Sequence, residues 1–284
     1  MKVIPMFALL AFAVVASLVV LPASPASAAI PGLHDVEVQA AFGAPGRQIS
    51  GSAQCPAGES LLSIGAGNAD LTGFGHSSQS PGVARAVGAP IRPSPLNFLF
   101  LQATCAPFAQ VPAGTVTVVA VAPASTSTLR TATARCRPGE IAYGGGGYLV
   151  PAQSTNPSLG GSRMVGSMVT ADGTGWRVTV HTRQLTDTLH VRALCARLPG
   201  ALLAPAVQAP RTVLVTTAGG YHSCPSSMQP LSGGAYIDNG SGGDSASARL
   251  EYSNRVPHPS RNGWFAAANN MQANDRLFVR VLCI

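Results

Sequence analysis

Six cysteines at regular spacing constrain this chain more than any other feature of its sequence. They form three successive pairs: Cys55 and Cys105, Cys136 and Cys195, Cys224 and Cys283. The second and third pairs have identical internal spacing, the first is somewhat shorter, and the steps from one pair to the next are nearly equal. A period of about 88 residues, seen three times, predicts three copies of one structural unit.

Glycine and tryptophan motifs recur at matching positions inside these units. Glycines follow the first cysteine of each pair, as Gly65-Ala66-Gly67, Gly144-Gly145-Gly146-Gly147 and Gly233-Gly234. Trp176 and Trp264 lie at the same offsets from both cysteines of their pairs, whereas the first unit has Ala86 at the matching offset before Cys105. We expect a shortened, diverged first unit and two full ones, at residues 29–110, 111–198 and 199–284.

Residues 1–28 follow the pattern of a cleaved signal peptide. Lys2 precedes an apolar run from Phe7 to Leu21, and Ala26-Ser27-Ala28 provides a small-x-small cleavage site. The run of about 15 residues is short for a membrane-spanning helix, which needs roughly 20. We expect a mature chain that begins at Ala29, is secreted to the extracellular space and does not insert into the membrane.

The residues between the cysteines favour strands over helices. Short runs alternate polar and apolar side chains at residues 115–118, 176–181 and 277–282, which is the period of a half-buried strand. We therefore expect an all-β fold of three quasi-repeated antiparallel units, with three sheets of about four strands in a β-prism-like or trefoil-like closure. Tandem β-sandwich modules are the alternative architecture.

Disulfides are the expected role of the six cysteines, because the chain has an export signal and no Cys-x-x-Cys motif. Threefold equivalence leaves two pairing schemes. Either each unit closes on itself, or each unit is joined to the next, as Cys105 with Cys136, Cys195 with Cys224 and Cys55 with Cys283. We favour the first scheme, since the short first unit retains both cysteines, and we expect each pair on neighbouring strands of one sheet.

Basic residues are spread along the mature chain. Lys2 is the single lysine, so the 18 basic residues become 17 arginines after cleavage, against 11 acidic residues, a formal charge of +6. A nucleic-acid-binding protein gathers its basic side chains into a patch. The scattered arginines therefore argue against nucleic acid as a partner.

No catalytic, cofactor-binding or metal-binding motif is found. No serine has the Gly-x-Ser-x-Gly context of a hydrolase, and no two histidines are four residues apart. His181 and His190 correspond to Asn269 and Phe278 in the third unit, unlike a duplicated metal site. The stretch Asp238–Asp244 resembles a calcium loop but has glycines at its third and fifth positions, where oxygen ligands belong. We expect no cofactor, and no catalysis.

Two kinds of position are candidates for a binding surface. Trp176 and Trp264 are aromatic residues on which a sugar could stack, but their equivalent positions in two units favour a shared core role. The loops expected at Thr155–Asp172 and Asp238–Asn262 differ in composition while the surrounding motifs repeat. Because binding residues tend to lie on loops held by a rigid frame, we expect any binding face there.

The repeated motifs resemble a known class of protein. Cys-x-x-Gly, a glycine run, Gly-Trp and a strand ending in cysteine together resemble a repeat of secreted actinobacterial proteins of unknown function, over residues 40–284. The start Cys55-Pro56-Ala57-Gly58 is similar, more weakly, to vitelline membrane outer layer protein, which implies a three-sheet β-prism. The third unit departs from the pattern with Ser227 where the others have glycine. The resemblance implies an architecture and carries over no functional residue.

A secreted scaffold of this kind fits a binding or structural role. We expect a non-enzymatic protein of the cell envelope or extracellular space, with a cell-wall or extracellular glycan, or a protein, as its partner. The alternative is a secreted hydrolase whose acidic residues meet only in three dimensions. That alternative would place two carboxylates of raised pKa in one cleft.

Overall fold

The computed structural model describes residues 29–41, 49–76, 82–90, 98–150, 162–211, 216–258 and 261–284. These residues form nineteen β-strands and one short 3-10 helix, η1 (Phe108–Gln110). The predicted all-β class is confirmed. Residues 1–28, which hold the predicted signal peptide, lie outside the described ranges. Among the described residues, no helix has the length and apolarity that crossing a bilayer requires.

Each predicted unit supplies one set of strands. The first contains β1 (His34–Ala41), β2 (Ile49–Gln54), β3 (Glu59–Gly67), β4 (Asp70–His76), β5 (Val83–Ala89) and β6 (Phe98–Pro107). The second contains β7 (Val116–Ala122), β8 (Leu129–Arg135), β9 (Ile141–Val150), β10 (Arg163–Val169), β11 (Gly175–His181) and β12 (Thr188–Ala196). The third contains β13 (Leu202–Leu203), β14 (Val207–Gln208), β15 (Ala218–Ser223), β16 (Pro230–Asp238), β17 (Arg249–His258), β18 (Arg261–Asn269) and β19 (Arg276–Cys283).

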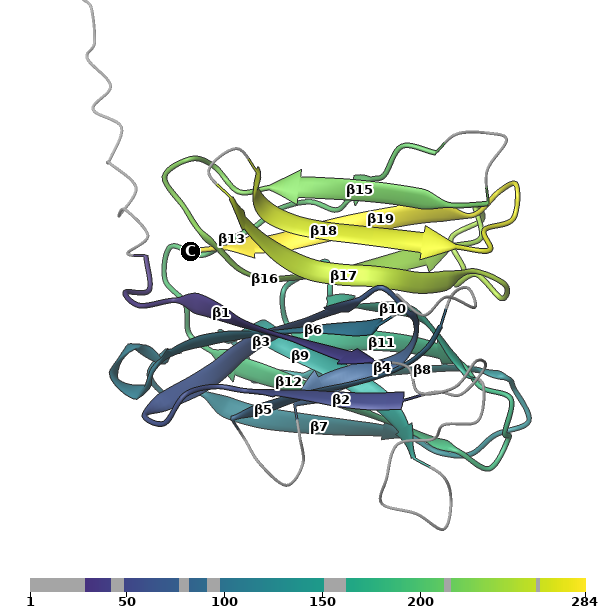
Figure 1. The fold of residues 1–284 in the computed structure, drawn as a ribbon, viewed down its shortest axis with the longest axis horizontal. Helices are drawn as coiled ribbons and strands as arrows, with labels where there is room; N and C mark the ends of the chain where they lie inside the picture. The colour runs from purple at the N-terminus through teal and green to yellow at the C-terminus, as the bar shows by residue number, and fades with distance from the viewer. Residues whose placement is uncertain are drawn as a thin grey trace, which may run out of the picture.

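The strands assemble into three antiparallel sheets, and each sheet draws on two units (Figure 1). Sheet A has the order β1-β6-β3-β17-β18-β15, and sheet B the order β2-β5-β4-β9-β12-β7. Sheet C has the order β13-β19-β16-β10-β11-β8, with β14 also paired to β19. The sheets have six or seven strands where about four were predicted, because three strands of one unit continue into three of another. Independent sandwich modules would not share sheets; a prism-like closure stays a prediction.

Equivalent strands make the contact between units in every sheet. The paired residues are Ala66 with Ser253, Gly147 with Phe74, and Ala235 with Ser167. They join β3 to β17, β9 to β4 and β16 to β10, and so the first unit to the third, the second to the first and the third to the second. We call these contacts the 3–1, 1–2 and 2–3 junctions.

The disulfides follow the within-unit scheme. They are Cys55–Cys105, Cys136–Cys195 and Cys224–Cys283, with Cα–Cα distances of 5.7, 5.5 and 5.7 Å. The expectation that each pair lies on neighbouring strands of one sheet is wrong. Cys136, for example, directly follows β8 of sheet C, whereas Cys195 lies in β12 of sheet B. Because each unit divides its strands between two sheets, its disulfide crosses from one sheet to the other.

Both tryptophans are core residues, as predicted. Trp176 is 2% exposed and Trp264 is 0% exposed. Each indole Nε1 donates a 3.0 Å hydrogen bond to a buried serine hydroxyl, of Ser167 and Ser253 respectively. A buried indole whose N–H is paired contributes apolar burial without the cost of an unsatisfied donor. Neither ring is available as a platform for a sugar.

The first unit uses different residues at the tryptophan position. The strand register places Ala84, opposite His76, where the other units have their tryptophans. The prediction that Ala86 is the counterpart of the tryptophans is wrong by two residues. The chain from Ala84 to Cys105 is two residues longer than the chain from each tryptophan to the second cysteine of its unit. Phe74 stands where the other units have the serine that binds the indole, and its ring is buried in the same core.

The strands nearest the junctions are buried on both faces. β4 is buried at every residue, and β3, β9, β10 and β16 at nearly every residue. A Cβ on Gly144 would collide with the carbonyl oxygen of Leu62, and one on Gly146 with the carbonyl oxygen of Phe74. Both collisions are with the backbone of the first unit, so the glycine run of β9 allows two units to approach closely.

Both loop predictions fail where a strand forms, and double burial explains the first of these failures. The loops expected at Thr155–Asp172 and Asp238–Asn262 contain strands β10 and β17, so this expectation is wrong for those residues. β10 is buried at nearly every residue, so it has no polar face and the alternation that identifies a strand is lost. β17 alternates buried and partly exposed residues, but a bulge between Leu250 and Tyr252 interrupts the alternation. Residues 155–161 and 259–260 of these loops lie outside the described ranges.

Candidate binding site at the junction of the first and second units

A cavity of about 610 Å³ lies at the 1–2 junction. Its walls come from the β2–β3 connection, the end of β4 and the segment after β6 in the first unit, and from β7, β9 and β12 in the second. The polar side chains on these walls include Glu59, His76, Thr115, Thr117, Tyr143 and Arg192. Small-ligand sites in proteins have volumes of about 300–1,000 Å³, and this cavity falls within that range.

His76, the last residue of β4, is the buried polar group of this cavity. Its side chain is 4% exposed, and its Nε2 atom makes no hydrogen bond within the protein. Burial, and to a smaller extent the positive charge of Arg192, lowers the pKa of His76 to about 4. The imidazole is therefore neutral near pH 7, and its Nε2 atom has no hydrogen-bond partner among the protein atoms.

Tyr143 and Thr115 place hydroxyl groups on the side of the cavity that the second unit forms, whereas His76 belongs to the first unit. Tyr143 is the extra residue of a bulge in β9, where the register with β12 shifts, and its side chain is 0% exposed. Its hydroxyl lies 3.1 Å from Thr115 Oγ1. Burial raises the pKa of Tyr143 to about 12, against the opposing effect of that hydrogen bond. The phenol therefore stays protonated. Because Thr115 Oγ1 donates its proton to the carbonyl oxygen of Pro112 at 2.6 Å, the Tyr143 hydroxyl donates to Thr115 and is left as an acceptor.

At the other two junctions, the residue equivalent to Arg192 makes hydrogen bonds across the junction. Its equivalents in the strand register, opposite the same glycine of the neighbouring strand, are Arg280 and Gln102. Arg280 Nη1 donates to the carbonyl oxygen of Val169 across the 2–3 junction, at 2.9 Å. Gln102 accepts from the N–H of Arg255 at 2.8 Å and donates to its carbonyl oxygen at 3.0 Å across the 3–1 junction.

The 3–1 junction shows what fills the equivalent space there. Arg255 is 4% exposed; its Nη1 donates to the Asp35 carboxylate at 2.9 Å and its Nε to the carbonyl oxygen of Pro230 at 2.7 Å. In the strand register, His76 takes the place of Arg255 at the 1–2 junction, and Thr117 takes the place of Asp35. Two smaller side chains replace a buried ion pair, and the cavity lies at these residues.

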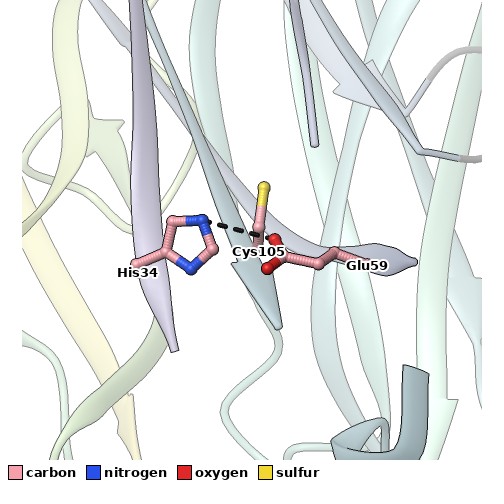
Figure 2. A group of neighbouring side chains, drawn as sticks. All are labelled: His34, Glu59 and Cys105. Carbon is pink, nitrogen blue, oxygen red and sulfur yellow. Dashed lines mark ion pairs between the residues drawn. The ribbon is translucent and has the colours of Figure 1, made fainter. Parts of the chain in front are cut away.

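A second cluster beside the cavity has the composition of a metal site. His34, Glu59 and Cys105 bring a nitrogen, a carboxylate oxygen and a sulfur within 4.8 Å of one another (Figure 2). Cys105 Sγ is bonded to Cys55, so it is not a thiolate and does not serve as a ligand. His34 Nε2 lies 3.3 Å from Glu59 Oε2, and His34 Nδ1 lies 2.9 Å from the carbonyl oxygen of Gly32. These contacts join the start of β1 to the start of β3.

The calcium-like stretch Asp238–Asp244 has its two carboxylates paired with arginines. Arg276 donates to both oxygens of Asp238, at 2.9 and 2.8 Å, and Arg177 donates to Asp244 at 2.5 Å. Burial raises the pKa of Asp238, but the hydrogen bonds from Arg276 and from the N–H of Gly240 outweigh it and leave the pKa lowered. A hollow of about 270 Å³ at the 2–3 junction is lined in part by these residues.

The two histidines considered as ligands do not come together. His181 lies at the end of β11 in sheet C, and His190 lies in β12 of sheet B. The His190 ring stacks on that of Tyr148 with centroids 6.2 Å apart. Burial lowers the pKa of both histidines, and nearby arginines add to the effect.

Motif reading missed His76, Thr117 and Arg192. One signal for Arg192 is present in the sequence, since the residue three before the second cysteine is Gln102, Arg192 and Arg280 in the three units. No protein-family model and no curated protein sequence matches this chain.

Proposed function

We propose that this chain is an extracellular, non-enzymatic binding protein that holds a small ligand, such as part of a cell-wall or extracellular glycan, in the cavity of the 1–2 junction. The observation that carries the proposal is the cavity itself, at a position where the 3–1 junction is filled by a buried ion pair. The unpaired Nε2 of His76 on its wall supports a polar ligand.

The disulfides and the signal-peptide pattern support the extracellular part of the proposal. Three disulfides are consistent with an oxidising compartment, where such bonds persist. Each bridge crosses between the two sheets of a unit and limits their separation. Because the cavity walls come from two units, a framework held in this way keeps the walls in place for binding.

The alternative function, a secreted hydrolase, makes a different demand on the site. Glycoside hydrolysis uses two carboxyl groups, about 5–9.5 Å apart, on either side of the scissile bond. Glu59 is the one carboxylate among the described residues that line the cavity, and it faces His34 at 3.3 Å. This composition supports binding over hydrolysis.

A glycan array and a cell-wall pull-down with mature protein, residues 29–284, test the proposal. The decisive variant is His76→Arg/Thr117→Asp, which rebuilds at the 1–2 junction the pair that Arg255 and Asp35 form at the 3–1 junction. We expect the parent to retain a ligand and the double variant to lose it while remaining folded. Arg135→Gln, at a side chain that is 65% exposed, is the control and should bind as the parent does.

Two results would contradict the proposal. Equal binding by the parent and the double variant would move the site away from the cavity. Release of cleaved glycan during the incubation, lost in the double variant, would establish the hydrolase alternative in place of simple binding.

A further inference from the structure

The 1–2 and 3–1 junctions distribute their charged side chains differently. At the 3–1 junction, Arg255 supplies the positive charge, Asp35 supplies the carboxylate, and Gln102 is the neutral hydrogen-bonding partner. At the 1–2 junction the positive charge lies on the strand equivalent to the one that carries the neutral residue at the 3–1 junction. Arg192 takes the place of neutral Gln102 and brings a positive charge, whereas Thr117 takes the place of Asp35 and brings none.

From this comparison we propose that the cavity selects a carboxylate-bearing ligand of monosaccharide to disaccharide size, whose carboxylate faces Arg192 beside His76. The inference rests on the proposed function, because it names the class of ligand for the same site. At the 3–1 junction Asp35 accepts from Arg255 and Thr104, whereas Gln102, the equivalent of Arg192, donates to the Glu37 carboxylate at 3.3 Å. Val119 stands at the position of Glu37 in the second unit, so the incoming carboxylate beside Arg192 takes the place of the Glu37 carboxylate. An arginine guanidinium suits this role because its planar N–H groups match the two oxygens of a carboxylate.

The remaining charges on the cavity wall are compatible with an anion. Glu59 is the acidic side chain among the described lining residues. Its Oε2 makes no hydrogen bond and lies 3.3 Å from His34 Nε2, with which it forms an ion pair when the imidazole is protonated. His76 is close enough to Arg192 for that charge to affect its pKa, and burial keeps the imidazole neutral. Its buried Nε2 can donate to a ligand oxygen in the tautomer that carries the proton there.

Hydroxyl groups on the wall favour a polyhydroxylated body attached to the carboxylate. Thr115, Thr117 and Tyr143 all line the cavity from the second unit. The Thr117 hydroxyl can donate to and accept from a sugar hydroxyl, whereas the Thr115 and Tyr143 hydroxyls donate within the protein and offer acceptor capacity to a ligand. An acidic sugar uses both the cation and the hydroxyls.

Titration calorimetry with three probes tests the inference: D-glucuronate, D-glucose as its neutral match, and acetate as a carboxylate without a ring. We expect the mature protein to bind glucuronate about 10- to 100-fold more tightly than glucose, the range for a hydrogen bond to a charged group. If acetate bound as tightly as glucuronate, the carboxylate part of the inference would stand and the sugar part would be overturned.

The repeats supply the matched variants. Arg192→Gln introduces the residue of the first unit, Gln102, and should reduce glucuronate affinity to that of glucose. Arg280→Gln makes the same change at the 2–3 junction and should leave affinity unaltered. Thr117→Asp, on an exposed side chain of β7, is a second variant that keeps Arg192. It supplies an internal carboxylate and should abolish the preference for glucuronate without removing glucose binding.

The outcomes separate this inference from the proposed function. A neutral glycan retained on the array, with unchanged binding in Arg192→Gln and Thr117→Asp, would overturn the carboxylate inference and leave the binding function standing. Failure of all three probes to bind the parent would also overturn it. A fall of glucuronate affinity to that of glucose in Arg192→Gln and Thr117→Asp, with Arg280→Gln unaffected, would establish it.

Discussion

Gly145 and Trp176 share one space in the core of the second unit, because a Cβ on Gly145 would overlap the indole ring of Trp176. The third unit repeats this relationship at the equivalent positions. In the first unit, Ile64 replaces the glycine and Ala84 replaces the tryptophan. Bulk has moved from one strand to the facing strand, which keeps the core filled.

Removal of Trp176 should therefore leave a cavity that a larger residue on the facing strand can fill. Trp176→Ala is expected to destabilise the mature protein by about 3–5 kcal/mol, measured by urea unfolding. Addition of Gly145→Ile to that variant copies Ile64 and Ala84 of the first unit. It should recover part of the loss if β12 shifts at Arg192, whose carbonyl oxygen lies 2.6 Å from the added Cβ. Gly145→Ile with Trp176 in place should be destabilising on its own; a neutral effect would show that the two residues do not compete for space.

Tryptophan fluorescence gives an independent check of the same packing. Trp176 and Trp264 are buried with their Nε1 atoms paired, so the native emission should be blue-shifted. Iodide should quench it poorly until the protein is unfolded. Strong quenching of the native protein would place at least one indole on the surface.

The disulfides should behave as three separate links between facing sheets. Non-reducing peptide mapping is expected to find the peptides of Cys136 and Cys195 joined, and not those of Cys105 and Cys136. Replacing both Cys136 and Cys195 by serine should cost about 4 kcal/mol in the chain-entropy model, because the bridge closes a loop of 59 residues. The Cys224 and Cys283 peptides should remain joined in that variant, which controls for disulfide exchange.

The regular features of the chain were predictable because they are visible in one dimension. Cysteines and tryptophans at fixed offsets indicate equivalent positions in equivalent units, and equivalent positions favour within-unit bridges and buried indoles. The sharing of sheets was not predictable, since it depends on pairings such as Phe74 with Gly147, between strands of different units. Double burial in β4 and β10 also removed the alternation by which these strands would have been recognised.

The candidate site was invisible for a related reason. His76, Thr117 and Arg192 belong to three strands of two units, and no local motif relates them. They become informative only when the strand register aligns them with Arg255, Asp35 and Gln102 of another junction. The sequence spacing from the second cysteine aligns Arg192 with its equivalents but misplaces Ala84, because the first unit carries a two-residue difference in length before Cys105.

Export should leave a mature chain with a defined N-terminus. The small-x-small site Ala26-Ser27-Ala28 predicts cleavage before Ala29. Intact-mass measurement of protein collected from the medium should give an N-terminus at Ala29 or within a few residues of it. Retention of the full-length chain in the membrane fraction would contradict the signal-peptide interpretation.

His76 should make the folded protein sensitive to acid. Its pKa in the folded protein is about 4, lowered by burial and by Arg192 from the ordinary value of 6.5. Between these two pH values the unfolded chain binds a proton that the folded protein does not, so stability is complete above about pH 6.5 and falls as the pH is lowered towards 4. The loss from this residue amounts to about 3 kcal/mol at most, measured as the unfolding free energy in urea at a series of pH values.

The control for this prediction is His76→Val, which introduces the residue found at Val169 in the second unit and should flatten the pH dependence. Part of the slope should persist, because burial also lowers the pKa of His181, His190 and His222. An unchanged slope in His76→Val would mean that the His76 imidazole is hydrated and able to take up a proton in the folded protein. That result would remove the neutral histidine from the binding site proposed at the 1–2 junction.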